Sequence, residues 1–272
     1  YSSAASDVYK RQDYNIGFPA KRITTQLEWE DMVLDYQVAT ELEEINVWIS
    51  SGKTVMEDWG LSRILKAGYR SLFYGPPGTG KTLAATLLGK KNEIDVYRID
   101  LSMIVSKYIG ETEKNLAKVF DLAENRNWIL FFDEADALFG KRTSTNTSND
   151  RHANQEVAYL LQRIEDFPGM VILATNLRSN IDEAFSRRFQ SVVYFPMPTE
   201  EQRAELWRNM LPGEWLGKDA EELITMAAET ELSGGAITNV VRRCALRMIQ
   251  SKKKLLDKVM LKEALQKEKI KS

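Results

Sequence analysis

The residues with the clearest chemical pattern run from Gly75 to Thr82 and read Gly-Pro-Pro-Gly-Thr-Gly-Lys-Thr. This run fits the pattern G-x-x-x-x-G-K-T without a departure. The glycines let the backbone curl so that its N–H groups converge on phosphate oxygens, and a helix starting here directs its positive end at the same anion. Lys81 can reach the β- and γ-phosphates of a nucleotide, and the Thr82 hydroxyl can bind magnesium. The predicted phosphate-binding residues are Gly75, Pro76, Pro77, Gly78, Thr79, Gly80, Lys81 and Thr82.

A pair of carboxylates, Asp133 and Glu134, follows the apolar run Ile129-Leu130-Phe131-Phe132. If that run is a strand of a parallel sheet, its carboxyl end faces the same crevice as the phosphate-binding loop. Asp133 is then placed to hold magnesium, and Glu134 to orient and deprotonate an attacking water. Each motif has an alternative without chemistry. The loop could be a glycine-rich turn with an incidental lysine, and the carboxylates could be a solvated Asp-Glu pair at a strand end. Their occurrence together argues against both alternatives.

The elements that must position these residues alternate between strands and helices. Short apolar runs at residues 70–74, 96–100, 129–132, 170–174 and 192–195 predict strands. Helical spacing at residues 27–49, 82–91, 112–125 and 153–165 predicts the helices around them, after an irregular lead-in at residues 13–25. This alternation predicts an α/β fold, a parallel sheet covered by helices on both faces.

The pattern changes after Pro196-Met197-Pro198, where only helix signals remain. Four helices are predicted, and each follows a residue that can cap its first turn: Thr199, Asp219, Ser233 and Asp257. We therefore expect an α/β nucleotide-binding domain at residues 13–196 and a small helical lid domain at residues 197–272. Residues 1–12 resemble translated sequencing-adaptor read-through, lack the apolar core of a signal peptide and are expected to be a non-native leader. The alternative is a native disordered arm.

Composition narrows the classes of function. Hydrophobic residues make up 43% and charged residues 28%, which is ordinary for a globular protein. The net charge of −2 gives no indication of nucleic-acid binding. One cysteine, Cys244, excludes an intrachain disulfide and fits a reducing compartment, so we expect a cytoplasmic protein. With a single histidine, His152, a structural zinc site is not expected. The apolar stretches are too short to span a bilayer, so no membrane association is expected.

From Leu27 to Ile270 the chain resembles the AAA family of ATPases, which implies ATP and Mg²⁺ as cofactors. The run from Met170 to Asn176 resembles the family's sensor strand, and Asn176 would help to position the water. The run from Asp182 to Phe189 resembles the segment with the arginine fingers, here the adjacent pair Arg187 and Arg188 as in the katanin and spastin type. Arg188 is the better match, and the alternative for Arg187 is a surface basic residue.

The segment Lys107-Tyr108-Ile109-Gly110-Glu111 resembles the family's first pore loop, in which Tyr108 would grip an extended polypeptide. The alternative is that Tyr108 packs where the second strand meets its helix. The resemblance implies a homo-oligomeric ring, a hexamer, acting on a protein substrate. Ser233-Gly234-Gly235-Ala236 resembles the lid segment near the adenine, and Val33 and Leu34 are weaker candidates for adenine contact. Arg242 and Arg243 are left out of the predicted site.

Three functions remain in competition at this stage. The first is an ATP-driven ring that remodels or threads proteins, and the second is an ATP-dependent machine acting on nucleic acid. The third is a nucleotide-binding scaffold without hydrolysis, against which Glu134, Asn176 and Arg188 argue. The lead-in from Trp29 to Trp48 is only loosely like the family's usual entry segment and better resembles a bacterial AAA group with further domains upstream. That departure leaves the substrate open.

Overall fold

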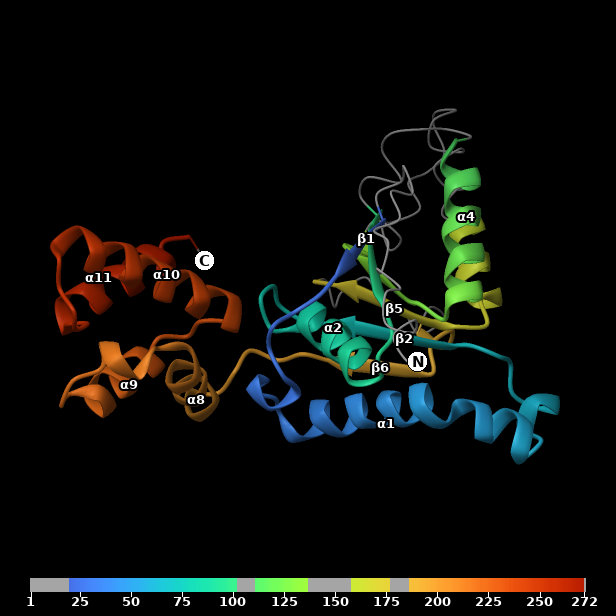
Figure 1. The fold of residues 1–272 in the computed structure, drawn as a ribbon, viewed down its shortest axis with the longest axis horizontal. Coiled ribbons are helices and arrows are strands. Elements are labelled where there is room, and N and C mark those ends of the chain that lie inside the picture. The colour runs from blue at the N-terminus through green and yellow to red at the C-terminus, as the bar shows by residue number, and fades with distance from the viewer. Residues whose placement is uncertain (1–19, 102–110, 137–157, 177–185, 272) are drawn as a thin grey trace, which may run out of the picture.

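A computed structural model describes residues 20–101, 111–136, 158–176 and 186–271 of the chain (Figure 1). Its sheet has six strands: β1 (Ala20–Ile23), β2 (Tyr69–Tyr74), β3 (Val96–Asp100), β4 (Ile129–Asp133), β5 (Met170–Thr175) and β6 (Ser191–Tyr194). Their order is β1-β3-β4-β5-β2-β6. Five of these strands, β3, β4, β5, β2 and β6, pair in parallel with their neighbours. This pairing confirms the predicted α/β fold and its parallel sheet.

The edge strand β1 departs from the expected pattern, because residues 13–25 were predicted to be irregular. Ala20 to Ile23 instead pair antiparallel with β3, with Ala20 opposite Ile99 and Ile23 opposite Val96. The strand has two basic residues in its middle and no apolar alternation, so its sequence has no strand signal. Backbone pairing at the sheet edge and an ion pair from Arg22 to Asp95, at 2.8 Å, hold it in place.

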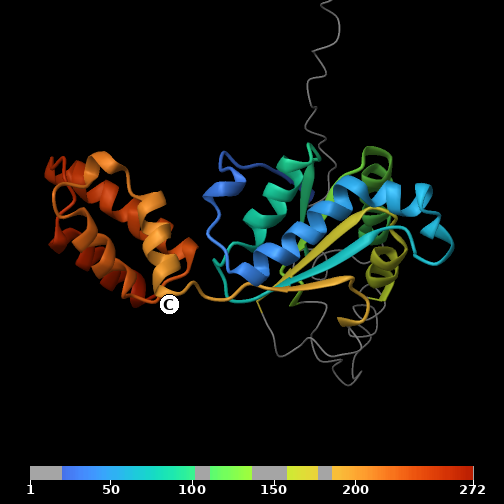
Figure 2. The ribbon, with the colours of Figure 1, turned by 90° about the horizontal axis from the view of Figure 1, so that it is seen from below.

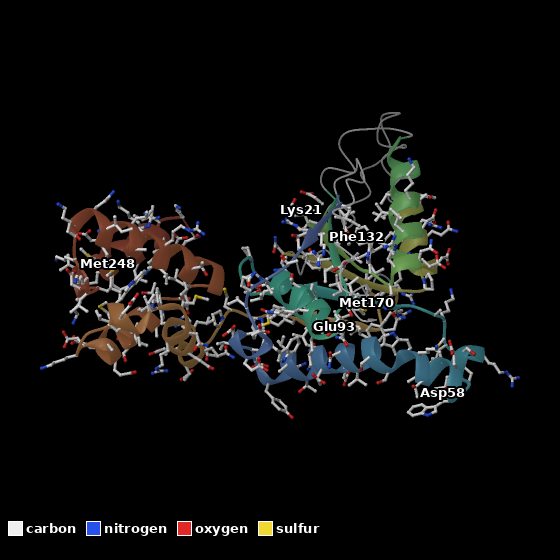
Figure 3. All side chains as sticks on the ribbon, in the orientation of Figure 1. Lys21, Asp58, Glu93, Phe132, Met170 and Met248 are labelled. Atoms are coloured by element: carbon white, nitrogen blue, oxygen red, sulfur yellow. The ribbon has the colours of Figure 1, made fainter. Side chains whose placement is uncertain are left out.

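Helices cover both faces of the sheet. On one face α1 (Tyr36–Lys53) and α2 (Lys81–Lys91) pack their apolar side chains against alternate strand residues such as Phe73 and Phe131. On the other face α4 (Glu111–Arg126) and the helical residues 158–166 pack against the strand residues that point the opposite way. Phe120 of α4 lies 6.0 Å from Phe132 between ring centroids. Figure 3 labels Phe132 among the side chains of the sheet. The alternating burial along each strand therefore makes a three-layer core.

The segment before α1 differs from the predicted helix at residues 27–49. A short 3-10 turn, η1 (Trp29–Asp31), comes first, and α1 begins only at Tyr36. The reason is local, because the carboxylate of Asp35 accepts a 2.8 Å hydrogen bond from the backbone N–H of Gln37 and so caps the helix there. After α1 the chain continues through a π-turn, η2 (Thr54–Asp58), and a 3-10 turn, η3 (Leu61–Arg63), into β2.

The C-terminal part is helical throughout, as predicted. It consists of α8 (Glu200–Met210), a 3-10 turn η4 (Gly213–Trp215), α9 (Ala220–Ala228), α10 (Gly234–Ser251) and α11 (Lys258–Lys269). Thr199 and Gln202 form a reciprocal capping box at α8, and Ser233 and Asp257 cap α10 and α11 through their side chains. These helices share their own buried core around Trp207, and Figure 2 shows them beside the sheet, joined by the segment that follows β6. No helix of the described ranges is long and apolar enough to cross a bilayer.

Candidate nucleotide-binding site

The loop between β2 and α2 has the backbone geometry of an anion cradle. Gly75, Gly78 and Gly80 have φ angles of 144°, 76° and 104°, which side-chain-bearing residues rarely adopt. A Cβ atom on Gly75 would lie 2.1 Å from the carbonyl oxygen of Phe195, so the loop also needs glycine for close approach to the end of β6. Gly80 directly precedes the first turn of α2, whose N–H groups point into the loop.

Lys81 is the first residue of α2, and its side chain is buried. The Nζ atom donates hydrogen bonds of 2.7 Å to the carbonyl of Gly75 and 2.9 Å to that of Pro76. Burial lowers the pKa of the Lys81 ammonium to about 8, against the opposing effect of Asp133 and Asp136. The ammonium is therefore mainly protonated at neutral pH and sits inside the loop, within reach of any anion that the loop holds.

The acidic pair stands at the carboxyl end of β4, as the sequence predicts. Asp133 Oδ1 accepts a 3.0 Å hydrogen bond from the backbone N–H of Glu134, while Asp133 Oδ2 contacts Arg98 Nη2 at 2.9 Å. Glu134 has a φ of 54° and an exposed side chain, and the next N–H, of Ala135, donates to the carbonyl of Ala174 at 2.8 Å. A non-glycine residue in this left-handed region is strained and recurs at functional sites. Glu134 is the first residue after β4, and it lines the cavity described next.

These groups line one cavity of about 470 Å³. The predicted residues that line it are Pro77, Gly78, Thr79, Gly80, Lys81, Thr82, Asp133, Glu134 and Asn176. The lead-in contributes a second wall, with Val33 and Leu34 among its residues, and the C-terminal helices contribute a third through Leu206 and Thr238. The backbone N–H of Gly235 donates a 3.0 Å hydrogen bond to the carbonyl of Gly78. The cavity is therefore closed by three parts of the chain that are far apart in sequence.

The two arginines lie elsewhere. Arg187 and Arg188 are both exposed and do not line this cavity. Arg188 forms an ion pair with Glu165 of the same chain. Lys107, Tyr108 and Ile109 fall outside the residues that the structure describes, so the pore-loop interpretation stays a prediction.

Comparison with known proteins names the family. Residues 71–197 match the family model for the ATPase family associated with various cellular activities (AAA). The chain contains an AAA-family ATPase module. A solved structure, the FIGL-1 AAA domain, superposes with a TM-score of 0.70 over 97% of this chain and 92% of that chain. Its sequence identity is 24%, so this match shows the fold alone.

Curated relatives extend the match to the same module in longer proteins. "Cell division protein C" of Sulfolobus acidocaldarius is 42% identical over 146 residues, 50% of this chain and 38% of the relative. "Uncharacterized AAA family ATPase y4kL" of Sinorhizobium fredii is 38% identical over 136 residues, 49% and 41% of the two chains. The "Proteasome-activating nucleotidase" of Methanocella arvoryzae is 31% identical over 193 residues, 68% and 46% of the two chains. The chain thus spans less than half the length of these relatives.

Two residues beside the AAA site were not predicted. Asp136 accepts a hydrogen bond from the hydroxyl of Thr175, at the end of β5, and Arg98 contacts Asp133. For Asp136 a signal existed, because it is the third carboxylate in the run Asp133-Glu134-Ala135-Asp136. For Arg98 the sequence alone contains no such signal, since only the register of β3 against β4 brings the side chains of Arg98 and Asp133 together.

The residues of the AAA site fit a magnesium nucleotide. The glycine positions leave room that a Cβ atom would fill, and a buried cation lies within the curl of the loop. Thr82 and Asp133 offer a hydroxyl and a carboxylate oxygen to the same cavity, and oxygen is the ligand type that magnesium prefers. The walls away from the phosphate loop include apolar residues such as Val33 and Leu206, which suits the base and sugar end of a nucleotide.

Proposed function

We propose that this AAA module binds ATP with Mg²⁺ and hydrolyses it to ADP and phosphate. The observation that carries the proposal is convergence: Lys81, Asp133, Glu134 and Asn176 come from α2 and from the ends of β4 and β5, and all line one cavity. A glycine-rich turn or a solvated acidic pair would not need to share a cavity. Their common location supports a single chemical site for phosphoryl transfer to water.

In this proposal the phosphates lie in the curl of the loop, over residues 75 to 80. The ammonium of Lys81 exchanges its hydrogen bonds to the carbonyls of Gly75 and Pro76 for hydrogen bonds to phosphate oxygens. A mobile ammonium with three donors can do this without moving the helix. Thr82 and Asp133 would hold the magnesium ion, since both line this cavity. When bound, that ion neutralises charge on the phosphates and on the leaving group.

Glu134 acts as the general base in this proposal. Its carboxylate is exposed to the cavity and free of the strand ladder, so it can accept the proton of a water that attacks the terminal phosphate. Asn176, at the end of the neighbouring strand β5, orients that water through its amide. The two side chains approach from adjacent parallel strands, which fixes their separation through the sheet.

We place Arg188, with Arg187 beside it, at the site of a neighbouring subunit. Both side chains are exposed and lie outside the cavity of their own chain. Arg188 would exchange its ion pair with Glu165 for the phosphate of a neighbouring subunit. A cation near the terminal phosphate stabilises the transition state, and its supply by a neighbour makes activity depend on assembly. A repeated head-to-tail contact that closes gives a ring, and we propose a hexamer.

A protein substrate is favoured over nucleic acid. The net charge of −2 provides no general attraction to phosphate backbones. Among the relatives, the proteasome-activating nucleotidase is named for action on a protein machine. The second candidate, action on nucleic acid, predicts binding of single-stranded DNA that weakens steeply with salt.

A matched pair of lysine variants tests the nucleotide site. Lys81→Ala should lose binding of a fluorescent ATP analogue, while Lys118→Ala, an exposed position on α4, should keep it. Thermal melting of both variants separates lost binding from lost folding. Equal nucleotide affinity in the two variants would remove the loop from its proposed role.

A further inference from the structure

Asp133, the proposed magnesium ligand, has both of its carboxylate oxygens engaged. Oδ1 accepts a hydrogen bond from the backbone N–H of Glu134 at 3.0 Å, and Oδ2 contacts Arg98 Nη2 at 2.9 Å. The Asp133 side chain is 19% exposed, so little water remains to solvate its charge. The guanidinium of Arg98 is therefore its principal neutralising partner among the described residues.

The strand register explains how Arg98 reaches this position. Asp100 lies opposite Asp133 in the parallel pair of β3 and β4, and Arg98 is two residues earlier on the same face of β3. That face is the one covered by α2, the helix that follows the phosphate loop. The Nε atom of Arg98 is buried without a hydrogen-bond partner in the described part of the chain, so the ion pair with Asp133 is what holds the guanidinium.

A guanidinium at this distance affects a divalent cation in two ways. It occupies the oxygen that a metal ion or its water would use, and its positive charge repels the ion across a short separation. Without Arg98, Asp133 would be a stronger metal ligand.

We infer that Arg98 is a positioning residue that competes with magnesium for Asp133 Oδ2. Arg98 thereby sets the Mg²⁺ concentration at which this module binds its nucleotide. The inference rests on the proposed function, because it takes Asp133 as the metal-binding carboxylate. With a metal ion bound to Asp133, Arg98 would leave Oδ2 and turn toward solvent, where its side chain is already 41% exposed.

The test measures binding rather than turnover. Each variant is made in the Glu134→Gln background, and a fluorescent ATP analogue is titrated with MgCl₂ and, separately, in EDTA. Arg98→Gln removes the charge, and Arg98→Lys keeps it. Arg22→Gln is the matched control, because Arg22 forms a comparable ion pair with Asp95 at the edge of the same sheet and is not part of the cavity. Asp133→Asn tests the metal ligand itself.

Arg98→Gln should lower the half-saturating Mg²⁺ concentration about three- to tenfold, the size expected for removing one partly screened charge. The half-saturating Mg²⁺ concentration of Arg98→Lys should stay within about twofold of the parent value, and Arg22→Gln should leave it unchanged.

An unchanged or higher half-saturating Mg²⁺ concentration in Arg98→Gln, with a strong shift in Asp133→Asn, would overturn this inference and leave the proposed function intact. An unshifted Asp133→Asn would overturn the metal role of Asp133 and this inference with it. If Arg98→Gln melts early, Arg98→Met replaces it, since methionine keeps much of the apolar length and removes the charge.

Discussion

The backbone N–H of Gly235 donates a 3.0 Å hydrogen bond to the carbonyl of Gly78, and this bond joins the C-terminal helices to the phosphate loop. The contact is close on both sides. A Cβ atom on Gly235 would lie 3.2 Å from Gly78 Cα, and one on Gly78 would lie 2.5 Å from the Ser233 hydroxyl. The loop that would hold phosphate and the start of α10 therefore share one packing surface. A displacement of the phosphate loop must therefore displace the start of α10, and the reverse.

A pair of glycine substitutions isolates this contact. Gly78 and Gly60 have similar φ angles, 76° and 70°, but a Cβ atom on Gly60 would meet nothing within 4 Å. Gly78→Ala and Gly60→Ala should both lose about 1–2 kcal/mol of stability for the left-handed backbone. Only Gly78→Ala should also weaken ATP binding, by about tenfold or more, because it displaces Ser233 from the loop. Thermal melts and binding titrations that show equal effects of the two variants on affinity would contradict the coupling.

Arg188 should act on a neighbouring subunit. Arg188→Ala should lower the rate of ATP hydrolysis by roughly 10³–10⁵ with little loss of nucleotide binding, since the missing charge serves the transition state. Arg208→Ala is the control, because it removes an exposed arginine from a comparable ion pair, with Glu221. Mixing Arg188→Ala subunits with parent subunits should depress the activity of the parent. A mixture whose activity is the simple average of its components would argue against action in trans.

Tyr108 is expected, from the sequence alone, to couple hydrolysis to a polypeptide. Tyr108→Ala should keep basal ATP hydrolysis and lose the unfolding of a tethered fluorescent protein. A buried structural tyrosine makes the opposite forecast, because truncating it costs about 3–5 kcal/mol and would remove stability and basal activity together. Melting and hydrolysis assays on one preparation distinguish the two interpretations.

Cys244 provides a pH-dependent signature of the C-terminal core. Burial raises the pKa of its thiol from 9.0 to about 11, against the opposing charges of Arg247 and Arg243. The folded state thus binds more protons than the unfolded state between pH 9 and 11, so the free energy of unfolding should fall as pH rises through that window. The loss should be on the order of 1–3 kcal/mol. Urea unfolding of the parent and of Cys244→Ala across these pH values tests it, and equal slopes in the two proteins would exclude the effect.

The sequence predicted the elements whose signals are local. Apolar runs located the five parallel strands to within about a residue at each end, because strands covered by helices on both faces are mostly apolar along their length. The four C-terminal helices followed from Thr199, Asp219, Ser233 and Asp257, each of which stands directly before its helix. The phosphate loop and the acidic pair were also predicted from local sequence, each at the end of an apolar strand, and residues of both line the cavity.

The features that the sequence did not predict depend on contacts between distant segments. Strand β1 exists because its backbone pairs with β3, and nothing in its four residues shows that pairing. Arg98 reaches Asp133 only through the register of β3 and β4. The family resemblance, and no local signal, placed Ser233 to Ala236 near the nucleotide, and the bond from Gly235 to Gly78 brings this segment to the loop. Pairing and packing across the chain, rather than propensity, decide these features.

The most direct test of the account is a comparison of binding and hydrolysis in Glu134→Gln. Glutamine keeps the shape of the side chain and loses the base, so only the chemical step should suffer. We expect nucleotide affinity close to that of the parent and a hydrolysis rate lower by roughly 10²–10⁴. Glu124→Gln, at an exposed position on α4, should match the parent in both measurements. Hydrolysis by Glu134→Gln near the parent rate would contradict the central claim, that this cavity hydrolyses ATP with Glu134 as its base.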